Sequence, residues 1–147
     1  RRGSMDGIGN GEKWESGSEI AEIFPSKTYV SKAQDLEVYK LAYALSLEVH
    51  RATLEMPKIE QYALADQLRR SSKSICANIA EGYGRQRQSS MEFKRFLIIA
   101  IGSCSESLVW LDYARDLGYV TIEQAQVWIE KYGSVERMLV KLRNTVK

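Results

Sequence analysis

From Asp35 to the C-terminus, apolar residues recur every three or four positions, which is the spacing of one face of an α-helix. Stop signals near Pro57, Gly82–Gly84 and Leu117–Gly118 interrupt this pattern three times. The two-residue alternation of a half-buried strand is absent from the sequence. The pattern therefore predicts four amphipathic helices and no sheet.

The first two helices have recognisable ends. We expect Asp35, or a capping box at Ser31–Gln34, to start the first helix and Pro57 to end it. The second helix should end at Gly82 and Gly84, because glycine readily adopts the left-handed conformation of a helix exit. The core faces expected of these two helices are Val38, Leu41, Ala42, Leu45, Val49 and Ala52 in the first, and Tyr62, Ala65, Leu68, Ser72, Ile75, Cys76 and Ile79 in the second.

The last two helices should each begin with a capping box, in which two side chains three residues apart satisfy amides of the first turn. Ser89 and Glu92 have this spacing, and so do Thr121 and Gln124. We expect the third helix to end at Leu117–Gly118. The expected core faces are Phe93, Phe96, Leu97, Ala100, Ile101, Cys104, Leu108 and Leu111 in the third helix, and Ile122, Ala125, Trp128, Ile129, Val135, Met138, Leu139 and Leu142 in the fourth.

Four helices of about 20 to 28 residues with short connections pack most simply as an all-α, antiparallel up-and-down four-helix bundle. The first and third helices carry more apolar residues than one core needs, and such surplus faces usually mark an interface. Either residues 20–30 or a second copy of the chain would cover them, and we favour homo-oligomerisation. The surplus residues are Tyr39, Tyr43, Leu47, Ile98, Ile99, Val109, Trp110 and Tyr113.

Residues 1–34 follow different rules from the bundle domain at 35–147. They hold five of the ten glycines and few apolar residues, which favours a flexible N-terminal arm. Arg1–Ser4 precede Met5 and look like a remnant of cloning. The apolar residues between Ile20 and Val30 could dock on the bundle or on a neighbouring subunit, although we favour a mobile arm.

Composition narrows the class of protein. The chain has 21 Lys or Arg against 19 Asp or Glu, and its net charge of +2 excludes a strongly basic or strongly acidic tail. Its two cysteines, Cys76 and Cys104, lack the spacing of a zinc or redox motif, so we expect buried thiols in the reducing cytoplasm. No apolar run has the length of a membrane span and no signal peptide is recognisable, so we expect no membrane association.

The sequence offers little for catalysis. His50 is the one histidine, and we interpret it as a polar surface residue. A dimetal bundle needs two Glu-x-x-His pairs, but Leu47 stands three residues before His50. Gly82 and Gly84 lack the third glycine and the preceding strand of a dinucleotide site. We therefore predict no enzymatic activity, no catalytic residue, no metal site and no cofactor.

One local charge asymmetry favours a nucleic-acid partner. Residues 67–95 hold seven cations against Glu81 and Glu92, for a local net charge of +5. We expect these cations to gather at one helix–helix corner and to bind phosphate oxygens of RNA or DNA. Alternatively, Arg85 and Arg87 offset the negative end of the second helix and the others form a solvated face. The predicted nucleic-acid-binding residues are Arg69, Arg70, Lys73, Arg85, Arg87, Lys94 and Arg95.

Polar and small residues within the helices indicate packing roles. We expect Asn78 and Glu81 to hydrogen-bond to Arg69 or Arg70 of a neighbouring helix or subunit and so to fix register. Gly102, Ser103 and Ser105 lower the intrinsic stability of the third helix, and we expect their small size to admit another helix closely.

Three runs carry a family resemblance: DLEVYK at 35–40, QLRRSSKSICANIAEGYGR at 67–85 and FLIIAIGSCSE at 96–106. With them, residues 35 to about 143 closely resemble the four-helix-bundle proteins encoded by intervening sequences of bacterial 23S ribosomal RNA genes. Cys76 departs from the family, which usually has proline there, and should leave the second helix straighter.

The resemblance implies a homopentameric ring without known enzymatic activity. It also implies, for a related branch, an accessory subunit of the reverse transcriptases of diversity-generating retroelements. We therefore expect a non-catalytic oligomeric bundle that binds RNA or DNA through its basic corner, with a protein-interaction accessory subunit as the alternative. The resemblance marks signature positions without an assigned ligand role, which are Gln67, Arg69, Arg70, Asn78, Glu81, Gly82, Gly84 and Arg85.

Overall fold

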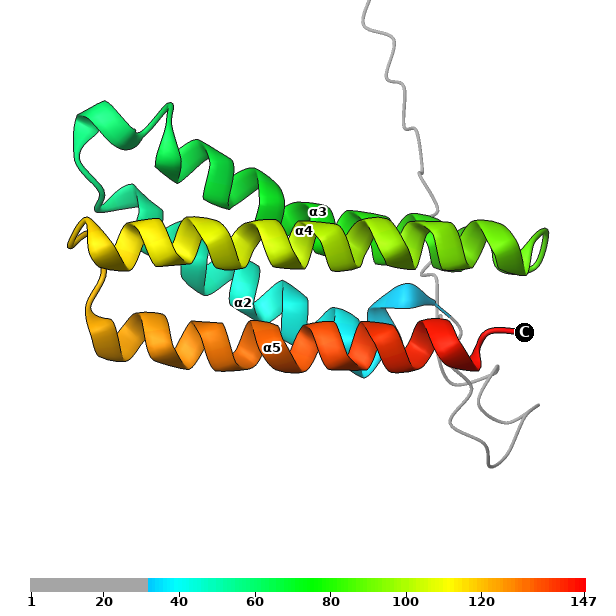
Figure 1. Cartoon of the computed structure of the whole chain (residues 1–147). Helices are drawn as coiled ribbons and strands as arrows, with labels where there is room; N and C mark the ends of the chain where they lie inside the picture. The colour runs from blue at the N-terminus through cyan, green and yellow to red at the C-terminus, as the bar shows by residue number, and fades with distance from the viewer. Residues whose placement is uncertain (1–31) are drawn as a thin grey trace, which may run out of the picture.

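The computed structural model describes residues 32–147 (Figure 1). This part of the chain contains four α-helices, two short 3-10 turns and no strand. The predicted mobile arm, the cloning remnant and the docking of residues 20–30 lie outside the described residues. The helices are α2 at Glu37–Leu54, α3 at Leu64–Arg85, α4 at Ser90–Asp116 and α5 at Ile122–Thr145, and the 3-10 turns are η1 at Ala33–Asp35 and η2 at Lys58–Glu60.

The four helices form an up-and-down bundle, which confirms the predicted fold class. α3 packs against both α2 and α4, and α5 closes the bundle by contacting α4 and α2. Figure 1 shows that α2 begins, the α3–α4 turn lies and α5 ends at one end of the molecule, which we call the C-terminal end. The α2–α3 and α4–α5 connections lie at the opposite end.

The core is built from one apolar face of each helix, as the sequence pattern predicts. Leu45, Ile75, Leu97 and Leu139, one from each helix in turn, are at most 1% exposed. The prediction of burial is wrong for two residues. Tyr62 precedes α3 and is 94% exposed, and Ile122 lies in the first turn of α5 and is 71% exposed. Both lie at the edge of an element, where periodicity carries the least information about burial.

Small polar residues join α3 to α4 along a seam. The Ser74 and Ser103 hydroxyls lie 2.9 Å apart, and the Ser107 hydroxyl donates to the Ser71 hydroxyl at 2.8 Å. The expected packing role is confirmed for Ser103. For Gly102 it is wrong within the chain, because a Cβ at this exposed position would meet nothing within 4 Å.

Gly82 and Gly84 do not form the predicted helix exit, because α3 continues through both to Arg85. Gly82 is buried where α3 lies close to α4: a Cβ there would lie 2.6 Å from the Phe96 Cβ. Glycine therefore serves here as a packing residue. Among residues 32–147, the glycine in the left-handed conformation is Gly118, with φ of 76°, which follows the end of α4 as predicted.

Capping is confirmed for two of the three predicted helix starts. The Ser89 side chain accepts from the Glu92 amide at the start of α4, and the Thr121 side chain accepts from the Gln124 amide at the start of α5. The Asp35 cap predicted for α2 is wrong, since the N-cap is Leu36 and makes no side-chain cap. The alternative capping box at Ser31–Gln34 includes Ser31, which lies outside the described residues. The turn η1, with its buried Ala33, precedes α2.

Candidate nucleic-acid interface

The seven predicted cations do not form one corner. Arg69, Arg70 and Lys73 lie in the first half of α3, while Arg85 ends that helix. At a rise of 1.5 Å per residue, the backbone of Arg70 is about 22 Å from that of Arg85 along the axis. Beyond the turn, Lys94 and Arg95 lie in the first turns of α4. The cations therefore form two groups, one near α2 and one around the α3–α4 turn.

Arg69 braces the connection between α2 and α3. Its guanidinium donates to the Gln61 carbonyl at 2.6 Å, to Gln61 Oε1 at 3.2 Å and to Thr53 Oγ1 at 3.0 Å. The Gln61 amide in turn donates to the carbonyls of Thr53 and Met56. These hydrogen bonds hold the guanidinium against Thr53 and Gln61 of the same chain. Arg69 therefore has a structural role, which its charge alone did not indicate.

The expected partners of Asn78 and Glu81 are wrong within the chain. The Asn78 amide donates to the Ser74 carbonyl at 2.8 Å and to the Ser74 hydroxyl at 3.0 Å. Glu81 pairs with Arg85 one turn ahead, and Arg70 pairs with Asp66 one turn behind at 2.9 Å. The bonds are local because side chains four residues apart on a helix are neighbours.

Around the α3–α4 turn, two arginines enclose one aromatic ring. The Arg85 and Arg95 guanidinium carbons lie 5.2 and 4.7 Å from the centroid of the Phe96 ring. Glu92 lies 3.0 Å from Arg95 and 3.8 Å from Arg85, and its hydrogen bond from Arg95 lowers the pKa of the Glu92 carboxyl. With Glu81 on Arg85 as well, this cluster is electrically balanced. Its arginines stabilise the turn and offer little net charge to a phosphate.

The remaining predicted cations lie on the surface to different degrees. Lys73 on α3 and Arg87 in the turn are exposed, while Lys94 is partly buried. The prediction of a compact seven-residue phosphate site therefore does not match the geometry. The sequence shows that the cations are close together along the chain. It does not show which carboxylates the fold places beside them.

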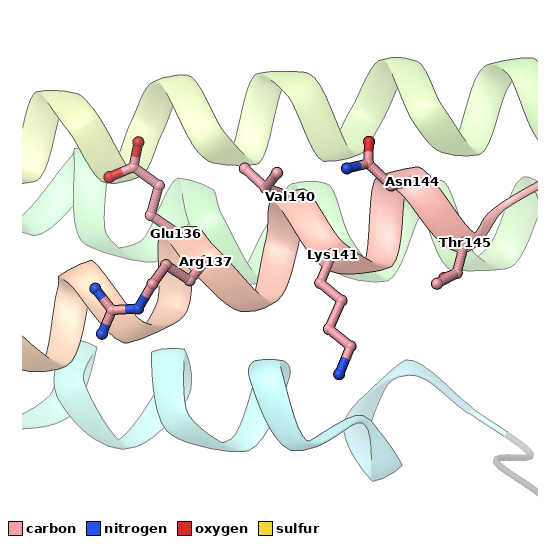
Figure 2. A pocket seen from close by; sticks show the side chains of 6 residues that line it. All are labelled: Glu136, Arg137, Val140, Lys141, Asn144 and Thr145. Atoms are coloured by element: carbon pink, nitrogen blue, oxygen red, sulfur yellow. The ribbon is translucent and has the colours of Figure 1, made fainter.

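A groove along α5 contains cations that the sequence reasoning missed (Figure 2). Its volume is about 500 Å³, and it is lined by Glu136, Arg137, Val140, Lys141, Asn144 and Thr145. Within residues 32–147, neither Arg137 nor Lys141 has a carboxylate at ion-pair distance. The sequence signal was available, since Arg137, Lys141, Arg143 and Lys147 follow one another closely with Glu136 as the one nearby acid.

Both thiols are buried, as predicted. Burial raises the pKa of the Cys76 thiol to about 11 and that of the Cys104 thiol to about 12. The Cys104 Sγ also donates to the Tyr132 carbonyl at 3.3 Å. At neutral pH both side chains are therefore protonated thiols without nucleophilic character.

His50 is not the simple surface residue that we expected. Its side chain is partly buried, and its Nδ1 atom is enclosed with no hydrogen-bond partner among the described residues. Burial lowers the pKa of His50, and the nearby charges of Lys73 and Arg69 lower it further. No group of three His, Cys, Asp or Glu side chains that could hold a metal ion is found in the part of the chain that the structure describes.

Four of the five surplus apolar residues predicted on α4 are exposed, whereas Trp110 is partly buried and packs against the core. Ile98, Val109 and Tyr113 are 54, 49 and 55% exposed, and the open position at Gly102 lies among them. Tyr43 and Leu47 are similarly exposed on α2. α4 is also long and apolar enough to cross a membrane by length and composition alone, a property that the core helix of a bundle can share.

These features define the class: a small four-helix-bundle protein with exposed apolar residues along α4 and a groove on α5 that contains two cations and one glutamate. The chain belongs to the 23S rRNA-intervening sequence protein family, whose family model matches residues 34–141. This confirms the resemblance seen in the sequence.

Comparison with other proteins adds support for the fold. A solved protein of unknown function from the S23 ribosomal protein family of Bacteroides thetaiotaomicron matches with a TM-score of 0.66 and 24% sequence identity. The match covers 74% of this chain and 96% of that chain, and at this identity it supports the fold alone. No curated protein matches the chain.

Proposed function

We propose that the protein is a non-catalytic bundle of the bacterial cytoplasm that assembles with copies of itself through α4 and binds RNA or DNA with the cations of the assembly. The observation that carries this proposal is the apolar face of α4. The homopentamer that the family resemblance implies is the assembly we propose.

The α4 face suits a second helix. Ile98, Gly102, Val109 and Tyr113 follow one another at intervals of four, seven and four residues, which correspond to one, two and one helical turns, so they share one side of the helix. The missing Cβ of Gly102 leaves room for close approach at its centre. Burying a complete apolar side chain contributes 1.5–3 kcal/mol, so covering the exposed half of Ile98, Val109 and Tyr113 contributes about 1 kcal/mol each.

Light scattering coupled to size exclusion tests the assembly. At micromolar concentration we expect a mass several times the 16.7 kDa of one chain. Val109→Glu should reduce the mass to that of one chain, because a carboxylate in an apolar interface has no partner. Val127→Glu is the matched control, since Val127 is 43% exposed on α5 and its replacement should leave the mass unchanged. If the wild type is monomeric and its circular dichroism spectrum shows that its helices are folded, the assembly is refuted.

Nucleic-acid binding is supported by charge that local carboxylates do not offset. Residues 32–147 carry three more cations than carboxylates, and an assembly multiplies this excess. We expect the protein purified from cells to carry nucleic acid, as judged by the ratio of its absorbance at 260 and 280 nm, and to release it at high salt. Purified protein without nucleic acid, and without binding to RNA or DNA at low salt, would contradict this part of the proposal.

The alternative is a protein-interaction subunit, for example for a retroelement reverse transcriptase. The pairing of Arg70, Arg85 and Arg95 with carboxylates favours it, because these cations then stabilise the bundle instead of binding phosphate. An exposed apolar face on α4 would suit such a partner as well as a second copy. Stoichiometric binding of a partner that Val109→Glu abolishes, in a chain that is monomeric alone, would favour this alternative.

A further inference from the structure

The two ends of the bundle differ in charge. The C-terminal end comprises residues 32–45, 75–103 and 134–147, which are the helix halves that meet where α5 ends (Figure 1). It contains ten Lys or Arg against five Asp or Glu, whereas the opposite end contains seven against nine. The net charges of +5 and −2 attract a polyanion to the C-terminal end and repel it from the other end.

Local carboxylates offset only part of the charge at the C-terminal end. Lys40, Arg85 and Arg95 each lie within ion-pair distance of a glutamate. Arg137 and Lys141 are both exposed, and neither has a carboxylate at ion-pair distance among residues 32–147, although Glu136 lines the same groove. The cations at this end that remain available to a polyanion therefore include those of the α5 groove.

The α5 groove orders its polar groups along the helix. Figure 2 shows Arg137 and Lys141 pointing toward α2, and Glu136 pointing toward α4 on the other side of the groove. The Arg137 guanidinium donates to the Ser134 hydroxyl at 3.0 Å, which holds it in place along the helix. Lys141 follows one turn later, at a rise of about 6 Å. Asn144 points toward α4, on the same side as Glu136 (Figure 2).

We infer that the α5 groove is a phosphate-binding surface, with Arg137 and Lys141 as the two charged contacts to the backbone of a nucleic-acid strand. This inference rests on the proposed nucleic-acid binding and assigns it to a surface other than the predicted corner in α3 and α4. Donors repeated at one-turn intervals on one side of a helix suit successive phosphates, which recur regularly along a strand. Contacts of this kind position the strand and carry no base specificity.

Fluorescence anisotropy with a labelled single-stranded RNA, repeated with duplex DNA, tests the inference on the full chain. The variant is Arg137→Ala with Lys141→Ala. The matched control is Lys58→Ala with Lys131→Ala, which removes the same charge from exposed positions at the opposite end. With about 0.7 counterion released per contact on a single strand, the double variant should lower the slope of log affinity against log salt by about 1.4. Its affinity should therefore fall about sevenfold less than that of the wild type between 50 and 200 mM salt.

The outcomes are distinct. A reduced slope and weaker binding in the groove variant, with the control behaving as wild type, support the inference. Equal binding by the groove variant and wild type overturns the assignment while leaving nucleic-acid binding intact. Absence of wild-type binding to either probe at 50 mM salt overturns the proposed nucleic-acid function and the groove with it. Selective displacement by polyglutamate at matched charge would overturn the inference in favour of an acidic polypeptide.

Discussion

Gly82 lies at a close contact between α3 and α4, and replacing it by alanine should destabilise the bundle. The added Cβ would lie 2.6 Å from the Phe96 Cβ and 3.1 Å from Phe93 Cδ2. The Phe96 Cβ is held by its own backbone, so the helices must separate. Overpacking of this kind costs about 1–3 kcal/mol, and the helix propensity of alanine returns up to about 1 kcal/mol. We therefore expect a net loss of about 1–2 kcal/mol.

Gly84→Ala is the matched control, because it makes the same change two residues later in α3. A Cβ at Gly84 would meet nothing within 4 Å, so only the propensity gain remains and the variant should be as stable as wild type or more stable. Urea unfolding followed by circular dichroism measures both free energies. If Gly82→Ala proves as stable as Gly84→Ala, the close contact between α3 and Phe96 is refuted.

Two further predictions concern the contribution of Arg69 to stability and the reactivity of the two buried cysteines. Arg69→Ala should lower the free energy of unfolding by about 1.5–3 kcal/mol, because it removes partly buried charged hydrogen bonds, while Arg70→Ala should change it by less than about 1 kcal/mol. Equal effects of the two changes in urea unfolding would contradict the bracing role of Arg69. Cys76 and Cys104 should react slowly with a thiol reagent at pH 8 in the native protein and rapidly in urea, since their pKa values of about 11 and about 12 leave little thiolate. Fast native labelling would show that the core opens readily.

The helices could be predicted because their signal is local and repeated. Many apolar residues at helical spacing report the same buried face, so errors at single positions such as Tyr62 do not change the fold. The role of Gly82 could not be predicted in this way. Glycine suits both a helix exit and a close helix contact, and the choice depends on Phe96, which only the folding of α4 onto α3 brings beside it.

The candidate site was harder to predict. The charged residues can be read from the sequence, but the groups that the fold places beside them cannot. Arg69 looked like a phosphate ligand until the fold placed the Gln61 carbonyl and the Thr53 hydroxyl beside its guanidinium. Conversely, the cations of α5 are close together in the sequence, but the sequence alone does not show which end of the bundle they occupy. They become significant because up-and-down topology brings the end of α5 to the same end as the α3–α4 turn and the start of α2.

The charge difference between the two ends of the bundle and the apolar face of α4 together determine where positive charge would lie in an assembly. The exposed apolar residues extend from Met91 in the first turn of α4 to Leu117 beyond its end, so a neighbour that covers them lies along the length of the bundle. In a cyclic assembly whose axis is parallel to the helices, every copy points the same way. The C-terminal ends then gather on one rim and the opposite ends on the other. A strand crossing the positive rim would meet an α5 groove from each copy in turn, so its affinity would depend on assembly as well as on Arg137 and Lys141.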